Sequence, residues 1–203
     1  MESMHIVRFR DGERAAYGVL EGGVVRRAAG DPFSGLTPGT EVGPLEQVTL
    51  LPPVEPSKIV AIGLNYLDHI TQDVQGFEKP ENPIIFLKPP SSLLAHGGNI
   101  VLPQGTERVE SEAELAVVIG RRARYVPAER AYDYILGFTC SNDVSARDYQ
   151  FKDGQWARAK SFDTFTPIGP AIATGLRADD LAIACRLNGE VRQQSTTAEL
   201  LFD

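Results

Sequence analysis

Short runs rich in β-branched residues recur through most of this chain, and glycine and proline separate them. The runs cover residues 58–66, 83–88, 115–120, 137–144, 167–174 and 181–189. Runs of this length are typical of strands, because branched side chains pack well on a pleated surface. Only two stretches, about Tyr66 to Asp73 and Ala128 to Tyr134, have a helical pattern. The sequence therefore predicts a mainly β fold of the α+β class, with a mixed or antiparallel sheet rather than a doubly wound one.

The first 55 residues differ in pattern from the rest. From His5 to about Ala29, short alternating runs are separated by Asp11-Gly12 and by Gly22-Gly23, dipeptides that close tight hairpins, which predicts a small antiparallel meander. Residues 30–57 are rich in proline, glycine and acidic residues and are expected to form a linker. We expect a small N-terminal β domain with its linker over 1–55 and a larger domain over 56–203. Because the pattern stops midway at the last residues, we expect the larger domain to lack a C-terminal segment.

Charge and hydropathy exclude several classes of protein. The formal net charge of -7 argues against a general nucleic-acid surface, which needs clustered Lys and Arg. No apolar run approaches the ~20 residues that span a bilayer, and the N-terminus lacks a signal pattern, so we expect a cytoplasmic protein without nucleic-acid or membrane partners. Cys140 and Cys185 lie in separate strand-like runs and are expected to be small core residues.

Residues 110–120 begin with three glutamates at alternating positions and continue with apolar residues. If this run is a strand, its period of two places Glu110, Glu112 and Glu114 on one face, followed on that face by Ala116 and Val118. Carboxylates that enter a core unpaired are costly, and a bound cation would remove that cost. An exposed edge strand whose acids face water is an equally good interpretation of this segment alone.

A second segment, residues 140–150, follows an apolar strand and places Asp143 at the end of that strand. Three oxygen ligands without His or Cys suit Mg²⁺, Mn²⁺ or Ca²⁺ better than Zn²⁺. The alternative is that Asp143 stabilises a turn and that Arg147 and Asp148 form a surface ion pair.

Two further residues are candidates for proton and charge chemistry. Lys160, one of five lysines, lies between aromatic residues and before a proline-fixed turn, where an ammonium group could stabilise an enolate or carboxylate oxygen; a surface lysine is the alternative. His69 follows a strand that ends near Gly63, a position from which a general base could act over the strand ends. A histidine on a helix face that only forms hydrogen bonds is the alternative for His69.

Six segments, taken in order, resemble the fumarylacetoacetate hydrolase family over about residues 58–202. They read GLNYLDH, NPIIFLKPPSSL, ESEAELAVVIG, SNDVSARDYQ, AKSFDTFTPIGP and NGEVRQ. The resemblance implies a β-roll core, usually in a homodimer, that acts on small 2-oxo carboxylates. It implies metal ligands at Glu112, Glu114 and Asp143, substrate contacts at Gln150, Lys160, Asn65 and Tyr66, and an acid-base residue at His69.

The resemblance leaves the reaction open between carbon-carbon bond hydrolysis of acylpyruvates and isomerisation or decarboxylation of related dienedioates. Relatives that cleave acylpyruvates have a Glu three residues after the histidine, and here that position is Gln72. A non-catalytic metal- or ligand-binding module is the alternative from another class. The apolar, proline-rich stretch from Pro83 to Leu94 supports the expected homodimer, and residues from Asn65 to about Pro80 are expected to form a mobile lid that carries His69.

Overall fold

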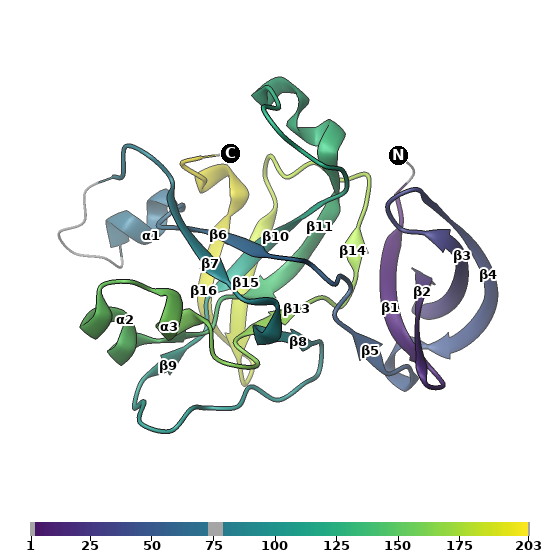
Figure 1. Cartoon of the computed structure of the whole chain (residues 1–203), viewed down its shortest axis with the longest axis horizontal. Coiled ribbons are helices and arrows are strands. Elements are labelled where there is room, and N and C mark those ends of the chain that lie inside the picture. Colours follow the sequence, from purple (N-terminus) through teal and green to yellow (C-terminus); the bar gives the residue numbers. More distant parts are fainter. Residues whose placement is uncertain (1–2, 73–78, 203) are drawn as a thin grey trace.

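The structure, a computed structural model, describes residues 3–72 and 79–202, without the side chains of His69, Thr71 and Gln72. Within these residues a mixed ten-stranded sheet and three two-stranded sheets make up most of the fold (Figure 1). The prediction of a mainly β fold is confirmed. No helix in the described ranges is long and apolar enough to cross a membrane.

The N-terminal residues form the predicted antiparallel meander. Its strands are β1 (His5–Asp11), β2 (Arg14–Glu21), β3 (Val24–Asp31) and β4 (Gly35–Pro44), followed by the 3-10 helix η1 (Leu45–Gln47) and by β5 (Leu50–Leu51). The expectation that residues 30–57 form only a linker is wrong, because β4 pairs with β3 from Asp31 to Val24. This strand lies at the edge of the sheet, where Pro38 and Pro44 can be accommodated, and its register shifts at two points.

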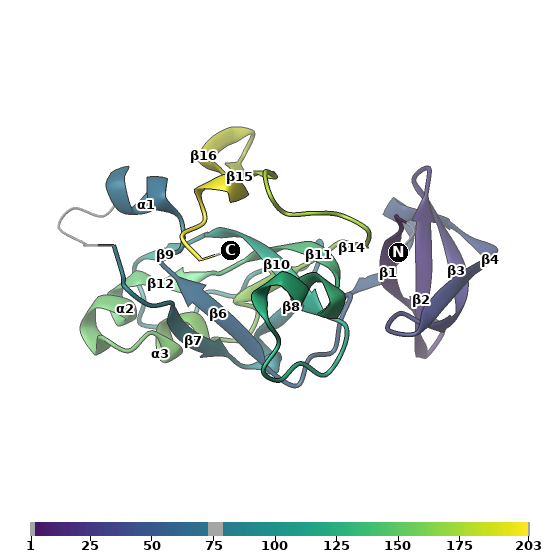
Figure 2. The ribbon, with the colours of Figure 1, turned by 90° about the horizontal axis from the view of Figure 1, so that it is seen from above.

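The meander is continuous with the larger sheet (Figure 2). Strand β1 pairs with β14 (Ile172–Ala173), and the order continues through β11 (Ile135–Asn142), β13 (Thr166–Ile168) and β8 (Leu93–Ala95), with β10 (Ala113–Ile119) beside β11. One cluster of buried side chains draws on both parts, since Ile6 and Leu36 pack with Leu136 and Ile172. The core thus fixes the meander against the sheet that carries the candidate site.

Three antiparallel two-stranded sheets complete the strands. They are β6 (Ile59–Gly63) with β7 (Ile84–Lys88), β9 (Val109–Glu110) with β12 (Ser145–Ala146), and β15 (Ala182–Leu187) with β16 (Glu190–Thr196). In β7 the side chains of Phe86 and Lys88 are buried, whereas Ile85 and Leu87 are 63% and 58% exposed. Alternation along β7 therefore directs a lysine inward and apolar side chains outward.

Helices are few and short. Helix α1 (Leu67–Gln72) confirms the first predicted helix, and the second is the 3-10 helix η3 (Ala128–Tyr134). Helices α2 (Arg147–Asp153) and α3 (Ala157–Lys160) were not predicted, and two more 3-10 turns are η2 (Pro90–Ser92) and η4 (Thr197–Glu199). Contrary to the expected core position, Cys140 is exposed; Cys185 is partly exposed, and both are free thiols.

Candidate active site

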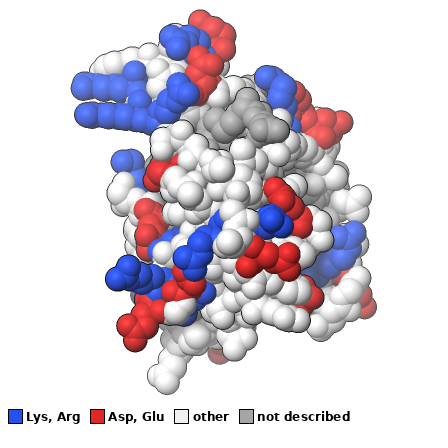
Figure 3. Space-filling model, turned by 90° about the vertical axis from the view of Figure 1, so that its right-hand side faces the viewer, with Lys and Arg blue, Asp and Glu red and all other residues white. Residues whose placement is uncertain are grey.

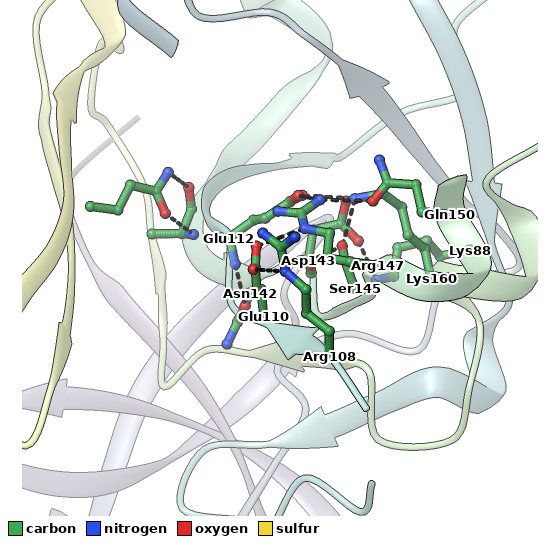
Figure 4. Close-up of polar contacts among 12 residues, drawn as sticks. Lys88, Arg108, Glu110, Glu112, Asn142, Asp143, Ser145, Arg147, Gln150 and Lys160 are labelled. Carbon is green, nitrogen blue, oxygen red and sulfur yellow. Dashed lines mark hydrogen bonds and ion pairs between the residues drawn. The ribbon is translucent and has the colours of Figure 1, made fainter. Parts of the chain in front are cut away.

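Lys160 lies at the centre of the candidate site (Figure 4). It is the last residue of α3 and is only 2% exposed. Its ammonium group donates hydrogen bonds to Oε2 of Glu112 at 2.7 Å, to Oδ2 of Asp143 at 2.6 Å and to Oγ of Ser145 at 2.8 Å. The rings of Phe86 and Trp156 lie 5.1 and 6.0 Å from its Nζ. The aromatic setting predicted for Lys160 is present, and the surface-lysine alternative is wrong.

A second buried lysine shares the same carboxylate. Lys88, at the end of β7, is 3% exposed and donates to Oδ1 of Asp143 at 2.5 Å and to the carbonyl oxygen of Phe165 at 2.9 Å. Asp143 therefore has an ammonium group on each of its two oxygens. The sequence patterns did not single out Lys88 or Ser145, although strand alternation places Lys88 on the same face as the aromatic Phe86.

The strand pair β10–β11 brings Glu112 and Asp143 together. The backbone amide of Asp143 donates to the carbonyl of Glu112 at 2.8 Å, and the Glu112 amide donates to Oδ1 of Asn142 at 2.9 Å. Because Lys160 contacts both carboxylates, the two contacted oxygens lie no more than about 5.3 Å apart. The sequence segments that suggested one site do therefore meet in space.

The acidic run does not form one continuous strand. Glu110 belongs to β9, which pairs with β12, and β10 begins only at Ala113. The carboxylate of Glu110 is bound by Arg108 at 2.6 Å and by Arg147 at 2.8 Å, which separates its surroundings from those of Glu114. The expectation of one strand with three acids on a single face is therefore wrong: β9 carries Glu110, β10 carries Glu114, and Glu112 lies between these strands.

Glu114 differs from Glu112 and Asp143 because no described residue forms an ion pair with it. Its side chain is partly buried, and among the described residues it forms no hydrogen bond or ion pair. Burial, and then the negative charges of Glu112 and Asp143, raise the pKa of Glu114 to about 8. The positive charges of Lys160 and Lys88 lower this pKa but do not outweigh those effects.

Arg147 links the site to α2. Its guanidinium group contacts Glu110 at 2.8 Å, Glu112 at 2.6 Å and Oε1 of Gln150 at 2.8 Å. The expected alternative, a surface pair between Arg147 and Asp148, is wrong, because Asp148 instead accepts hydrogen bonds from Thr106 and from two backbone amides. Arg147 thus orients Gln150, which the sequence suggested as a substrate contact.

Burial and ion pairing act against each other on the paired groups. Burial would raise the pKa of Glu112, but Lys160 and Arg147 outweigh it and hold the pKa below its ordinary value. Burial raises the pKa of Asp143 and lowers that of Lys88, and their mutual contact opposes both shifts. The site is therefore an electrostatic network in which removal of one charge leaves another uncompensated.

The donor chemistry of this site fits a hard cation, although the present contacts are ion pairs. Carboxylate oxygens suit Mg²⁺, Mn²⁺ or Ca²⁺, and Glu114 supplies a carboxylate with no ion pair to any described side chain. In residues 3–72 and 79–202, no three His, Cys, Asp or Glu side chains are arranged so that they could hold a metal ion by themselves. Lys160 lies between the carboxylates of Glu112 and Asp143 instead.

The segment that precedes α1 lies beside this site. Asn65, suggested as a substrate contact, uses its amide to bind the backbone of Phe202, with distances of 3.0 and 2.9 Å. Burial, and then the charges of Glu114 and Asp68, raise the pKa of Tyr66 to about 12. The side chain of His69 and residues 73–78 of the expected lid lie outside the described residues.

The pKa of Glu114 gives a testable pH dependence in metal-free protein. Because folding raises this pKa from 4.5 to about 8, the folded state keeps a proton that the unfolded state loses, and this contribution to stability falls as pH rises across that window. We expect the melting temperature of Glu114→Gln in EDTA to exceed that of the unsubstituted protein increasingly toward pH 8. Glu107→Gln, at an exposed position, should follow the unsubstituted protein, and parallel curves for all three proteins would contradict the assignment.

Comparisons with known proteins identify the family of this chain. Residues 58–203 match the family described as fumarylacetoacetate (FAA) hydrolase C-terminal, and residues 4–53 match the one described as Rv2993c-like, N-terminal. A protein of Archaeoglobus fulgidus is 54% identical over 81% of this chain and 65% of its own length. The mitochondrial oxaloacetate tautomerase Fahd2a of Rattus norvegicus is 44% identical over 78% of this chain and 52% of its own length.

Solved structures extend the comparison to almost the whole chain. The structure of 5-carboxymethyl-2-hydroxymuconate delta-isomerase from Mycobacterium smegmatis has a TM-score of 0.87 and 42% identity, over 98% of this chain and 78% of that one. The 2-hydroxyhepta-2,4-diene-1,7-dioate isomerase from Mycobacterium marinum has a TM-score of 0.88 and 39% identity, over 98% and 77%. The chain spans between about half and two thirds of the length of the curated relatives named above. It belongs to the fumarylacetoacetate hydrolase family.

Proposed function

We propose that this protein is a divalent-cation-dependent enzyme that relocates a proton on small 2-oxo or 2-hydroxy dicarboxylates through an enolate, as an isomerase or tautomerase. The observation that carries the proposal is the buried ammonium group of Lys160 in contact with Glu112 and Asp143, near Glu114, whose pKa is raised to about 8. The similarity to two isomerases and to an oxaloacetate tautomerase supports this class of reaction.

In this proposal Glu112, Glu114 and Asp143 hold Mg²⁺, or Mn²⁺ or Ca²⁺ in its place. The cation supplies Lewis-acid stabilisation of negative charge on the 2-oxo and carboxylate oxygens of the substrate. Glu112 and Asp143 each have a second cationic partner, Arg147 and Lys88. Each carboxylate would therefore keep a cationic partner if the cation took the place of its contact with Lys160.

Lys160 and Gln150 then bind the substrate. The hydrogen bond to Ser145 and the rings of Phe86 and Trp156 keep the Lys160 ammonium group in a buried setting, where a positive charge stabilises an enolate oxygen strongly. Arg147 occupies Oε1 of Gln150, which leaves the amide Nε2 to donate to a substrate carboxylate.

His69 is the proposed proton carrier. It lies in α1, three residues after Tyr66, and the charge of Glu114 raises the pKa of Tyr66, which places this segment near the site. We expect His69→Ala to lower kcat by at least roughly 10²-fold, the lower range for general acid-base help, and to leave cation affinity unchanged. Stopped-flow assays and calorimetric titration with Mn²⁺ measure the two quantities. A variant that loses cation binding would show that His69 is a ligand instead.

A substrate panel tests the proposed reaction directly. Oxaloacetate enol, 2-hydroxydienedioates and acylpyruvates are offered with Mg²⁺ and with EDTA, and products are followed by ultraviolet absorbance and by NMR. We expect cation-dependent proton relocation on the first two substrates. Acylpyruvate cleavage without proton relocation would support hydrolysis, and cation binding without any turnover would support a binding module.

We also infer a homodimer from an exposed apolar face of the β6–β7 pair. Val60, Ile62, Ile85 and Leu87 all point outward from this pair, at exposures between 37% and 63%. A contiguous apolar surface of this kind is typical of an interface between subunits. Light scattering at micromolar concentration should give the mass of a dimer, and a monomer mass would contradict the inference.

A further inference from the structure

A cavity of about 320 Å³ lies where the N-terminal meander meets the larger sheet. Phe33, in the turn between β3 and β4, forms one wall, and the end of η3 and the start of β11 form the others. Two short segments complete the lining. The one after β10 contributes Gly120 and Arg121, and the one after β14 contributes Gly175 and Leu176. The cavity therefore draws on four segments that are far apart in the sequence.

This cavity is separate from the candidate active site. Both contact β11, but the cavity lies at the beginning of that strand and Asp143 follows its end. Five residues separate Phe138 from Asp143 in the sequence, which corresponds to about 17 Å along an extended strand. A register shift between Val118 and Ile119 interrupts the β10–β11 ladder on the cavity side. Such irregularities often lie beside binding sites, because they re-aim side chains.

Aromatic rings dominate the walls of the cavity. Phe33 is 47% exposed, and Tyr132 lies 6.2 Å from Phe138 between ring centroids. Tyr132 is held from outside the cavity, since its hydroxyl accepts a hydrogen bond from the Ala178 amide at 3.0 Å and Arg177 stacks on its ring at 4.4 Å. Tyr132 therefore presents a fixed, flat surface, and the exposed ring of Phe33 is a second one, on which another ring can stack.

One cationic side chain in the lining has no partner. Arg121 is exposed and forms no ion pair or hydrogen bond within the described part of the chain, whereas Asp133, which also lines the cavity, is paired with Arg130 at 3.0 Å. Arg121 begins the projecting segment 121–134, which also contains Arg122 and Arg124. Figure 3 shows Lys and Arg side chains beside Asp and Glu side chains on the projecting part at the top of the view. Because Asp133 is paired with Arg130, Arg121 is the charged side chain of the lining that can pair with an anion.

We propose that this cavity is a second binding site, which takes a small aromatic carboxylate. The ring of the ligand stacks between Phe33 and Tyr132, and its carboxylate pairs with Arg121 in the bidentate manner that a guanidinium group allows. A cavity of about 150 Å³ is enough for benzene, so the volume here also accommodates a carboxylate. The site does not depend on which reaction the enzyme performs.

Benzoate is the probe ligand. Benzamide is the uncharged control compound, and cyclohexanecarboxylate is the non-aromatic one. Saturation-transfer NMR and titration should give a Kd on the order of 1 mM for benzoate, as expected for so small a ligand, and weaker binding for both matched compounds. Arg121→Ala should weaken benzoate about tenfold and leave benzamide unchanged. Phe33→Ala should weaken all compounds that contain a ring. Both positions are exposed, so neither variant is expected to affect folding.

Two control variants distinguish binding in this cavity from binding elsewhere on the protein. Arg122→Ala removes a neighbouring exposed arginine that does not line the cavity and should leave benzoate binding unchanged. Lys160→Met should also leave it unchanged, because benzoate bound at the active site would depend on that lysine. Binding that is lost in Lys160→Met and kept in Arg121→Ala and Phe33→Ala would overturn the proposal, as would the absence of any binding at about 10 mM.

Discussion

Replacement of Lys160 with methionine is expected to lower turnover by roughly 10³-fold and, at the same time, to tighten the binding of Mn²⁺ about tenfold. The loss of turnover follows from the loss of a buried positive charge that stabilises the enolate. The gain in affinity has a different cause. Lys160 now occupies oxygens of Glu112 and Asp143, and its removal frees both oxygens for the cation. Steady-state kinetics and calorimetric titration measure the two effects on the same preparation.

The opposite signs of these two effects make the test decisive. A residue that merely supported the fold would lower cation affinity and turnover together. Because Asp143 retains Lys88 and Glu112 retains Arg147, the variant leaves no carboxylate of this pair without a cationic partner, and it is expected to fold. Lys152→Met, at an exposed position in α2, is the matched control and should alter neither quantity. Turnover within about threefold of the unsubstituted enzyme would exclude Lys160 from the proposed chemistry.

Lys88→Met is expected to lower the free energy of unfolding by about 3–5 kcal/mol, the range for removal of one partner from a buried ion pair. The ammonium group of Lys88 is almost fully buried, and its removal leaves Oδ1 of Asp143 without its donor and the carbonyl oxygen of Phe165 with the backbone amide of Val144 alone. Urea denaturation in EDTA, followed by circular dichroism, measures the change without a contribution from bound cation.

A double-mutant cycle identifies the source of that loss. If the cost arises from an unpaired Asp143, then Asp143→Asn should recover part of the stability when it is added to Lys88→Met. Additive losses would show instead that the methionine packs poorly. Lys152→Met is again the matched control, and its effect should stay within about 0.5 kcal/mol.

Much of the fold could be predicted because strands of this protein carry a local signal. The β-branched runs became β6, β7, β10, β11 and β15, and the Asp-Gly and Gly-Gly dipeptides became the hairpin turns of the meander. The segments around Glu112, Asp143 and Lys160 could be expected to meet because each carries polar residues that a core would otherwise exclude. The structure brings these three side chains together, and their role as cation ligands or substrate contacts stays a prediction.

Strand β4, the orientation of β7 and helices α2 and α3 could not be predicted, because they depend on partners that are distant in the sequence. Proline and glycine in residues 35–44 oppose a central strand, and only the edge position beside β3 makes β4 possible. In β7, Ile85 and Leu87 point outward, whereas Lys88 points inward. Hydrophobicity alone would therefore place the face with Ile85 and Leu87 in the core, which is the wrong face. Helices α2 and α3 are too short to show a reliable period, and their side chains are held by the site, through contacts such as those of Arg147 and Lys160.

The pairing of β1 with β14 has a consequence for synthesis on the ribosome. The meander emerges first and can fold from its own hairpins, but His5 and Ile6 pair with Ala173 and Ile172, which emerge far later. At about 5–20 residues per second, that end of β1 waits on the order of ten seconds or more for β14, with the edge that faces β14 unpaired. Nascent chains should therefore be most prone to associate with one another during this interval, and slow codons placed between the two strands should lower the yield of native protein.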